Sequence, residues 1–284
     1  MSSTTAIRLR RRSGPLAEVR KLGAFMRREW LVASSDRLAH VSDVAAVAVG
    51  VVMFALIGRM VDPAVLPVIG GERTTYMEFA AVGIVLGAFI QVSMARVSRA
   101  IEDEQSRGTL ESLLSTTTAT STIFLGSVVY DFVYVPLRTA IFLITMVAMF
   151  GLSYRLDGAL PAALYLLAFL PFVWGLGMVS AAITLTFRRG AGLFTIAITM
   201  LTVGAGIYFP LAVLPESAAA IAPFNPIWIA SSGMREAFLT GAWGSLDFKI
   251  LLLPLLSVFT LTLGLLAIRL ALRREREQGS LALY

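Results

Sequence analysis

The sequence predicts an all-α integral membrane protein with six transmembrane helices, and three observations support this class. Hydrophobic residues make up 57% of the 284 residues and charged residues only 15%, whereas an ordinary soluble domain is roughly 45–50% apolar. Six apolar stretches are each long enough to cross a hydrocarbon core of about 30 Å as a helix. Lysine and arginine also gather on one side of these stretches, as they do in inserted membrane proteins.

The six stretches are separated by short polar or proline-containing segments, and together they define a membrane domain over 37–272. They are residues 44–61, 79–97, 123–150, 160–187, 191–209 and 250–268. With both termini on the same side, eighteen of the 24 Lys and Arg residues lie there. Five lie opposite, at Arg59, Arg73, Arg155, Arg235 and Lys249. The positive-inside rule therefore places both termini in the cytoplasm, and the Ala- and Arg-rich composition suggests a prokaryotic inner membrane.

The chain begins with a basic stretch over 1–14, which we expect to be flexible and retained, because no apolar run follows it directly. Residues 15–36 have helical periodicity, with Leu16, Val19 and Leu22 on one side and cations between them. This pattern predicts an interfacial helix, with Trp30 at headgroup depth and the cations on anionic membrane lipid. A soluble amphipathic helix packed on a partner is the alternative. Residues 273–284 are expected to form a cytoplasmic tail.

Between the second and third stretches, residues 101–115 form an acidic amphipathic segment. Glu102, Asp103 and Glu104 lie at its start, where the helix dipole favours negative charge. Four-residue steps join Asp103 to Arg107 and Arg107 to Glu111, so these charges can pair along one helical face. Leu110, Leu113 and Leu114 supply an apolar side, and Gly108 allows the backbone to bend. Such a surface could dock on a soluble partner, or it could cap the bundle at the membrane surface.

The third stretch contains two charged residues, Asp131 and Arg138, seven residues apart and therefore on one helical face, with Tyr134 between them. A charge at mid-bilayer costs about 2.5–3.5 kcal/mol on insertion scales, so Arg138 should face the bundle, a partner subunit or a wet pathway. It could contact a polar or anionic substrate, or it could fix helix packing through an ion pair. An ion-coupled secondary carrier that uses Asp131 and Arg138 is an alternative function, although such carriers usually contain inverted repeats and this sequence shows none.

The segment between the fifth and sixth stretches is too apolar for a free loop and too rich in proline for one spanning helix. Its prolines are Pro210, Pro215, Pro223 and Pro226. Two short re-entrant outer helices that dip into the membrane and turn back would satisfy both facts. Backbone turns at that depth need protein around them, so this segment should pack on the bundle or on a second copy.

Several kinds of chemistry are unsupported by the sequence. Its two lysines, Lys21 and Lys249, are not in a Gly-Lys-Ser/Thr phosphate-binding loop. It has no cysteine and a single histidine, His40, so a metal or haem site lacks ligands. No Gly-x-Ser-x-Gly elbow is present. We therefore expect no enzyme activity, cofactor or metal in this chain itself, and we attribute its net charge of +6 to membrane orientation rather than to nucleic-acid binding.

The acidic segment contains a specific pattern, Glu-x-x-x-Gly-Thr-Leu-Glu-x-Leu-Leu, which runs from Glu104 through Gly108, Thr109 and Glu111 to Leu114. It resembles the coupling-helix signature of ABC transporter permeases of the second exporter type. Further similarities extend the resemblance over about residues 15–272. They are Tyr76, Phe79 and Gly83 at the entry to span two; Phe209, Pro210, Pro215, Asn225 and Pro226 in the re-entrant outer element; and 15–36 as the interfacial elbow helix. The family often has Thr-Pro or Ser-Pro after the signature, whereas here Thr118 is followed by Ala119.

This resemblance implies a transmembrane subunit without its own ATP site. It would pair with a second permease copy or paralogue and with cytoplasmic ABC ATPase subunits, which hold ATP and Mg²⁺. The ATPases would act on residues 102–114 and drive alternating access. The implied cargo is a hydrophobic or amphipathic molecule such as a drug, a lipid or a glycolipid or polysaccharide.

Overall fold

The computed structural model describes residues 15–35, 45, 49–50, 52–62, 64, 66–69, 71–106, 120–187, 191–241 and 249–278. Most of these residues are helical, which confirms the all-α class. The exception is a two-residue antiparallel ladder between β1 (Val68–Ile69) and β2 (Glu72–Arg73), in which Val68 lies opposite Arg73.

Six of the eight longer described helices fall in the predicted apolar stretches two to six, and the other two cover the predicted interfacial segment and part of the predicted outer segment. The eight are α1 (Pro15–Ser35), α3 (Tyr76–Ser106), α5 (Thr120–Val128), α6 (Asp131–Phe150), α7 (Ala159–Phe187), α8 (Ala191–Gly204), α10 (Pro226–Thr240) and α11 (Lys249–Gln278). The shorter elements are η2 (Leu156–Gly158), η3 (Leu211–Val213), α9 (Glu216–Ile221) and η4 (Ala222–Phe224). The first predicted span, 44–61, is described only in part, and its residues 52–58 are helical.

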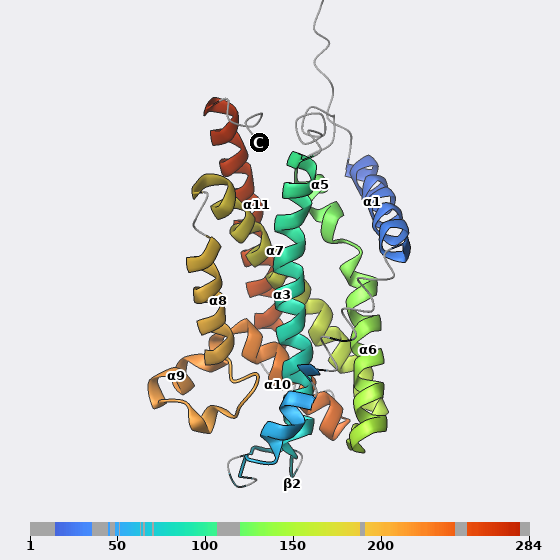
Figure 1. Cartoon of the computed structure of the whole chain (residues 1–284), viewed down its shortest axis with the longest axis vertical. Helices are drawn as coiled ribbons and strands as arrows, with labels where there is room; N and C mark the ends of the chain where they lie inside the picture. The colour runs from blue at the N-terminus through green and yellow to red at the C-terminus, as the bar shows by residue number, and fades with distance from the viewer. Residues whose placement is uncertain are drawn as a thin grey trace, which may run out of the picture.

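Three of the described helical segments are long and apolar enough to cross a membrane: Val133–Phe150, Leu156–Phe187 and Leu251–Glu275. Two shorter apolar segments, Tyr76–Val92 and Gly192–Gly204, lie at predicted spans two and five. The chain is therefore a helical membrane protein. Figure 1 shows α1, α5 and the C-terminal end of α11 at one end of the bundle, and α9 and the short ladder at the other.

Helix α7 is the centre of the bundle, and it packs against α11, α3 and α10. In the apolar part of α7, 72% of the residues are buried inside the bundle, whereas in the apolar parts of α6 and α11 only 22% are buried. The crossing of α7 and α11 depends on glycine, because a Cβ on Gly175 would lie 2.5 Å from the backbone of Thr260. A Cβ on Gly264 would lie 2.5 Å from the carbonyl oxygen of Gly175. Small residues thus allow these two helices to approach closely.

The predicted third span is not one continuous helix. It divides into α5 and α6 at a turn over Val129–Tyr130, where the Val133 N–H bonds to the Tyr130 carbonyl at 3.1 Å. Pro136 lies inside α6. Proline has no N–H, so one helical hydrogen bond is missing, and its ring crowds the carbonyl four residues earlier. A regular helix therefore cannot run undisturbed through this region.

The predicted fifth span is shorter than expected, because α8 ends at Gly204 rather than at residue 209. Gly206 adopts a left-handed φ of 59° and turns the chain toward the outer segment. The second span is longer than expected, because α3 continues past residue 97 to Ser106. Its final turns therefore contain Glu102, Asp103 and Glu104.

The N-terminal segment is helical as predicted, and α1 packs on α5. A Cβ on Gly126 would lie 2.5 Å from the ring of Phe25, so the two helices meet closely there. Farther along α1, the half-exposed Trp30 makes an edge-to-face contact with Tyr130, with ring centroids 6.0 Å apart.

Candidate functional site

The predicted coupling residues fall partly within the described chain. Glu102, Asp103 and Glu104 lie at the end of α3, in the same long helix as the second span. The other seven lie outside the described residues; they are Arg107, Gly108, Thr109, Leu110, Glu111, Leu113 and Leu114. The predicted ion pairs along this segment therefore stay predictions.

A cavity of about 40 Å³ lies between α3 and α6, and the predicted intramembrane residues Tyr134 and Arg138 both line it. Thr139 adds a hydroxyl, and the α3 wall is apolar. This volume corresponds to roughly three water-sized positions of about 10–15 Å³ each, so the cavity suits a small group rather than a whole amphiphile. Asp131 begins α6, two turns from Arg138 and on the same helical face.

Tyr134 also connects this cavity to the N-terminal helix. Its ring stacks on Tyr130 with centroids 5.4 Å apart, and Tyr130 in turn meets Trp30 of α1. A continuous aromatic row therefore runs from α1 to the cavity wall. Aromatic rings prefer offset-stacked and edge-to-face arrangements, which are the two arrangements seen in this row.

At the opposite end of the bundle, α8 is followed by the outer element, defined as residues 205–241, which contains η3, α9, η4 and α10. The Asn225 side chain connects the last turn of α8 to the start of α10. The Asn225 Nδ2 donates to the Leu201 carbonyl at 2.8 Å, while its Oδ1 accepts from the Ile227 N–H at 3.0 Å. Asn225 is thus the N-cap of α10, followed by Pro226 at the first helical position. Asn225 and Pro226, which the resemblance placed in the re-entrant outer element, therefore form the start of α10.

Arg235 on α10 forms the most extensive of these contacts, and it is only 4% exposed. Its Nη2 donates to the Ile207 carbonyl at 2.6 Å, and its Nε donates to the Phe79 carbonyl at 3.0 Å. The guanidinium also lies over the Phe79 ring, 3.7 Å from its centroid. We call these three residues the outer joint. Burial of a charge is costly unless hydrogen bonds compensate, and here two carbonyls and a ring supply the compensation.

Glycine allows α3 to reach the outer joint. A Cβ on Gly83 would lie 1.8 Å from the Ile207 carbonyl oxygen, which is far inside contact distance. One turn before Phe79, the Tyr76 hydroxyl donates to the Tyr208 carbonyl at 3.1 Å. Tyr76, Phe79 and Gly83 follow one another at steps of three and four residues, so they share one face of α3, and this face contacts the outer element.

Glu78 lies beside this face and is 8% exposed. It forms a capping box with Thr75, because the Thr75 N–H donates to Glu78 Oε2 at 2.8 Å and the Glu78 N–H donates to the Thr75 hydroxyl at 3.3 Å. Its Oε1 accepts from the Ser153 N–H at 3.1 Å, and its carbonyl accepts from the Tyr154 hydroxyl at 2.8 Å. Burial raises the pKa of Tyr154, and the charge of Glu78 raises it further, so this phenol stays a donor.

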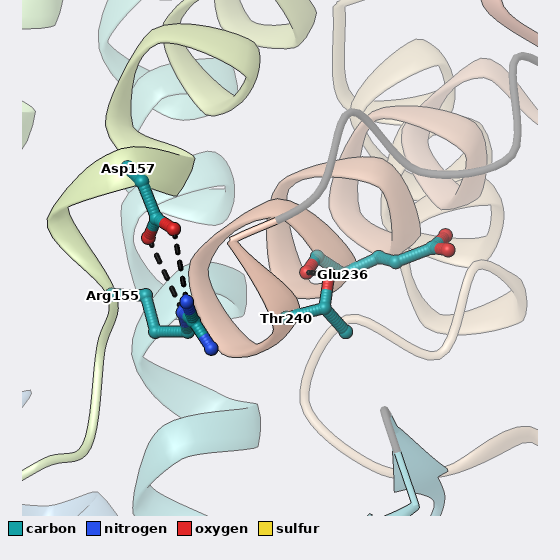
Figure 2. Close-up of polar contacts among 4 residues, drawn as sticks. All are labelled: Arg155, Asp157, Glu236 and Thr240. Carbon is teal, nitrogen blue, oxygen red and sulfur yellow. Dashed lines mark hydrogen bonds and ion pairs between the residues drawn. The ribbon is translucent and has the colours of Figure 1, made fainter.

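Two more exposed polar pairs lie just before α7 and at the end of α10 (Figure 2), where the Arg155 N–H donates to the Phe238 carbonyl at 2.8 Å. Arg155 and Asp157 form a two-pronged ion pair, with Nε–Oδ1 at 3.3 Å and Nη2–Oδ2 at 3.1 Å. On α10, the Thr240 hydroxyl donates to the Glu236 carbonyl at 2.7 Å. The Arg155 and Asp157 side chains are 59% and 53% exposed, so the pair contributes little stability.

Arg235 and Glu78 were not predicted as site residues. The sequence analysis counted Arg235 among the outer charges, whereas the structure buries it. A sequence signal did exist for Glu78, because Thr75-x-x-Glu78 matches the capping-box pattern. Among the residues that the structure describes, no group of three His, Cys, Asp or Glu could hold a metal ion.

Comparison with known proteins agrees with the helical membrane architecture. A family model described as ABC-2 type transporter matches residues 20–239, which is well over half of the chain. A comparison with curated proteins finds no match. The matched range includes α3, the outer joint and the segment that resembles a coupling helix. The chain therefore belongs to the ABC-2 type transporter family and is a membrane permease.

Proposed function

We propose that this permease is the transmembrane subunit of an ATP-driven exporter with six spans and two cytoplasmic termini. It pairs with a second copy or a close paralogue, and cytoplasmic ABC ATPases act on residues 102–114. ATP and Mg²⁺ bind to those ATPases and not to this chain. The cargo is a hydrophobic or amphipathic molecule, such as a drug, a lipid or a glycolipid or polysaccharide, and it leaves the cell by alternating access.

The observation that carries this proposal is the length and direction of α3. Its 31 residues rise about 46 Å at 1.5 Å per residue, which exceeds a hydrocarbon core of about 30 Å. It begins beside the outer element and ends, with Glu102–Glu104, at the end of the bundle that also contains α1 and α5 (Figure 1). The charge distribution of the sequence assigns that end to the cytoplasm, where an ATPase could contact the acidic residues.

The outward faces of the bundle support a membrane position and a paired assembly. Large apolar side chains are exposed along α6, α8 and α11, including Leu137, Ile144, Ile196, Met200, Leu255 and Phe259. A soluble monomer rarely exposes so many large apolar side chains along three helices. Lipid covers part of this surface in the proposed exporter, and the second permease covers another part.

Charge reversal tests the coupling assignment. With a candidate ATPase co-expressed, Glu104→Lys should abolish co-purification or stimulated ATP hydrolysis, because a cation replaces an anion at the docking surface. Glu277→Lys is the matched control, since Glu277 lies near the cytoplasmic end of α11 in an exposed ion pair with Arg273. Assembly and hydrolysis that survive Glu104→Lys as well as they survive Glu277→Lys would show the docking assignment to be wrong.

The α3–α6 cavity supports a substrate contact at Arg138. Arg138→Ala should reduce export of an acidic amphiphile about tenfold more than export of a neutral one, because only the acidic cargo can form an ion pair with the guanidinium. Leu137→Ala is the control, because Leu137 is exposed on the same helix but does not line the cavity. Equal losses for both cargoes would assign Arg138 to helix packing. Transport driven by an ion gradient without ATP would instead favour a secondary carrier.

A further inference from the structure

The structure assigns to Arg235 a positioning role beyond the stability of the fold. We propose that Arg235 fastens the outer element to the first turns of α3, so that the two move as one unit during transport. This inference rests on the proposed function, in which force enters at the cytoplasmic end of α3. It identifies the residue through which movement of α3 reaches the outer side of the permease.

The bonding geometry supports a fastening role. The two carbonyls that Arg235 contacts belong to different parts of the chain: Phe79 is in the first turn of α3, and Ile207 follows the end of α8. One guanidinium therefore joins α10, α3 and the α8 end at a single point, with a further 3.4 Å contact to the Ser231 hydroxyl within α10. A planar fork can hold two acceptors in fixed directions, which a lysine ammonium does not reproduce.

The absence of free space at this joint makes it stiff. The Gly83 backbone lies directly against the Ile207 carbonyl, and a Cβ on Gly87 would lie 2.0 Å from the Tyr208 hydroxyl. The Ile207 carbonyl accepts a hydrogen bond from Arg235, and the Tyr208 carbonyl accepts one from the Tyr76 hydroxyl. Sliding of the outer element along α3 would break these bonds before new ones could form, and unbonded polar groups at such depth are costly.

Helix α3 is also suited to carry movement along its length. Pro136 interrupts the helical ladder of α6, Pro171 that of α7 and Pro254 that of α11, whereas α3 contains no proline. Proline is the commonest cause of sharp helix kinks, so α3 is the long described helix that can best transmit a push between its ends. A shift at Glu102–Glu104 therefore reaches Phe79 as a rigid movement, and Arg235 transfers it to α10.

The first test measures the joint in the permease alone. The chain has no cysteine, so paired Cys substitutions can be spin-labelled without background. Gln91→Cys on α3 and Phe224→Cys on η4 report the position of the outer element, and Leu164→Cys with Leu255→Cys reports the separate α7–α11 packing. Arg235→Met should broaden the distance distribution of the first pair and leave the second unchanged, and Arg235→Lys should give an intermediate width.

The second test measures transport in the complex with its ATPase. Arg235→Met should lower export about tenfold, because movement of α3 no longer reaches the outer element. ATP hydrolysis should stay within about twofold of wild type, because the ATPase itself is unchanged. Arg155→Met is the matched control, since it removes an exposed arginine on the same side. Export that stays at the wild-type level, or a first spin-label pair that stays narrow, would overturn the inference.

Broadening of both spin-label pairs would also overturn it, because Arg235 would then only support the fold. Failure of the proposed function is distinguishable from failure of this inference. An ATPase that never binds the wild-type permease would refute the exporter assignment. The spin-label comparison needs no ATPase and would still decide whether Arg235 fastens the outer element to α3.

Discussion

Replacement of Gly83 by alanine should destabilise this permease far more than the loss of one hydrogen atom suggests. The new Cβ would lie 1.8 Å from the Ile207 carbonyl oxygen, a backbone atom that cannot rotate away. That oxygen also accepts the 2.6 Å bond from Arg235. Any shift that relieves the clash therefore weakens a charge-assisted hydrogen bond in a buried site.

The magnitude follows from three contributions. Overpacking costs about 1–3 kcal/mol, a strained or lost bond to a charged group costs about 1.5–3 kcal/mol, and better helix propensity returns about 0.5–1 kcal/mol. The net loss is about 3 kcal/mol, which corresponds to a fall of roughly 6–12 °C in apparent Tm for a domain of this size. Thermal aggregation of the detergent-solubilised protein, followed by fluorescence-detected gel filtration, measures this change.

Gly192→Ala provides the matched control, because no atom lies within 4 Å of its Cβ position in α8. It should leave Tm unchanged or raise it slightly. If Gly83→Ala proves as stable as Gly192→Ala, then α3 and the outer element do not approach each other as closely as described, and the outer joint loses its main support.

Three further predictions concern other contacts. Asn225→Ala should lower the free energy of unfolding by about 1–3 kcal/mol, because the N-cap of α10 and one of the two hydrogen bonds to the Leu201 carbonyl are lost; denaturation in detergent measures this. Gly175→Ala should cost about 1–3 kcal/mol by overpacking the α7–α11 crossing, seen as a lower Tm. Arg273→Ala should leave Tm within error of wild type, because its ion pair with Glu277 is exposed.

Each of these outcomes can contradict the structure. An unchanged stability in Asn225→Ala would mean that the Asn225 side chain does not connect the start of α10 to the end of α8 as described. A harmless Gly175→Ala would mean that α7 and α11 are farther apart than described. A loss in Arg273→Ala as large as that in Gly175→Ala would show that the end of α11 is not solvent-exposed.

Much of the fold could be predicted because bilayer thickness and charge distribution constrain it directly. The apolar stretch at 160–187 corresponds closely to α7, and the stretch at 250–268 lies within α11, which continues ten residues farther, to Gln278, and so includes part of the predicted tail. The errors lie where a helix breaks. The chain turns after Gly204 at Gly206, which has a left-handed φ of 59°. Asn225 and Arg235, both distant in the sequence, donate to the Leu201 and Ile207 carbonyls on either side of this turn. No local sequence signal reports donors from such a distance.

The candidate site was predicted unevenly for a similar reason. The seven-residue step from Asp131 to Arg138 places them on one helical face, and Arg138 does line a cavity. Arg235 was counted among outer charges because sequence shows a charge but not its acceptors. Phe79 lies 156 positions away and Ile207 lies 28 positions away. Contacts over such separations arise from the packing of the whole bundle.

The short length of α8 has a consequence for the surrounding lipid. Its 14 residues rise only about 21 Å, so this flank falls about 9 Å short of a typical acyl layer. Beyond its end, Val213, Ile221 and Phe224 expose apolar side chains that the ends of lipid acyl chains can contact. The bilayer must thin beside α8 or cover these apolar side chains. The acyl-chain length of the lipid therefore affects this side of the permease.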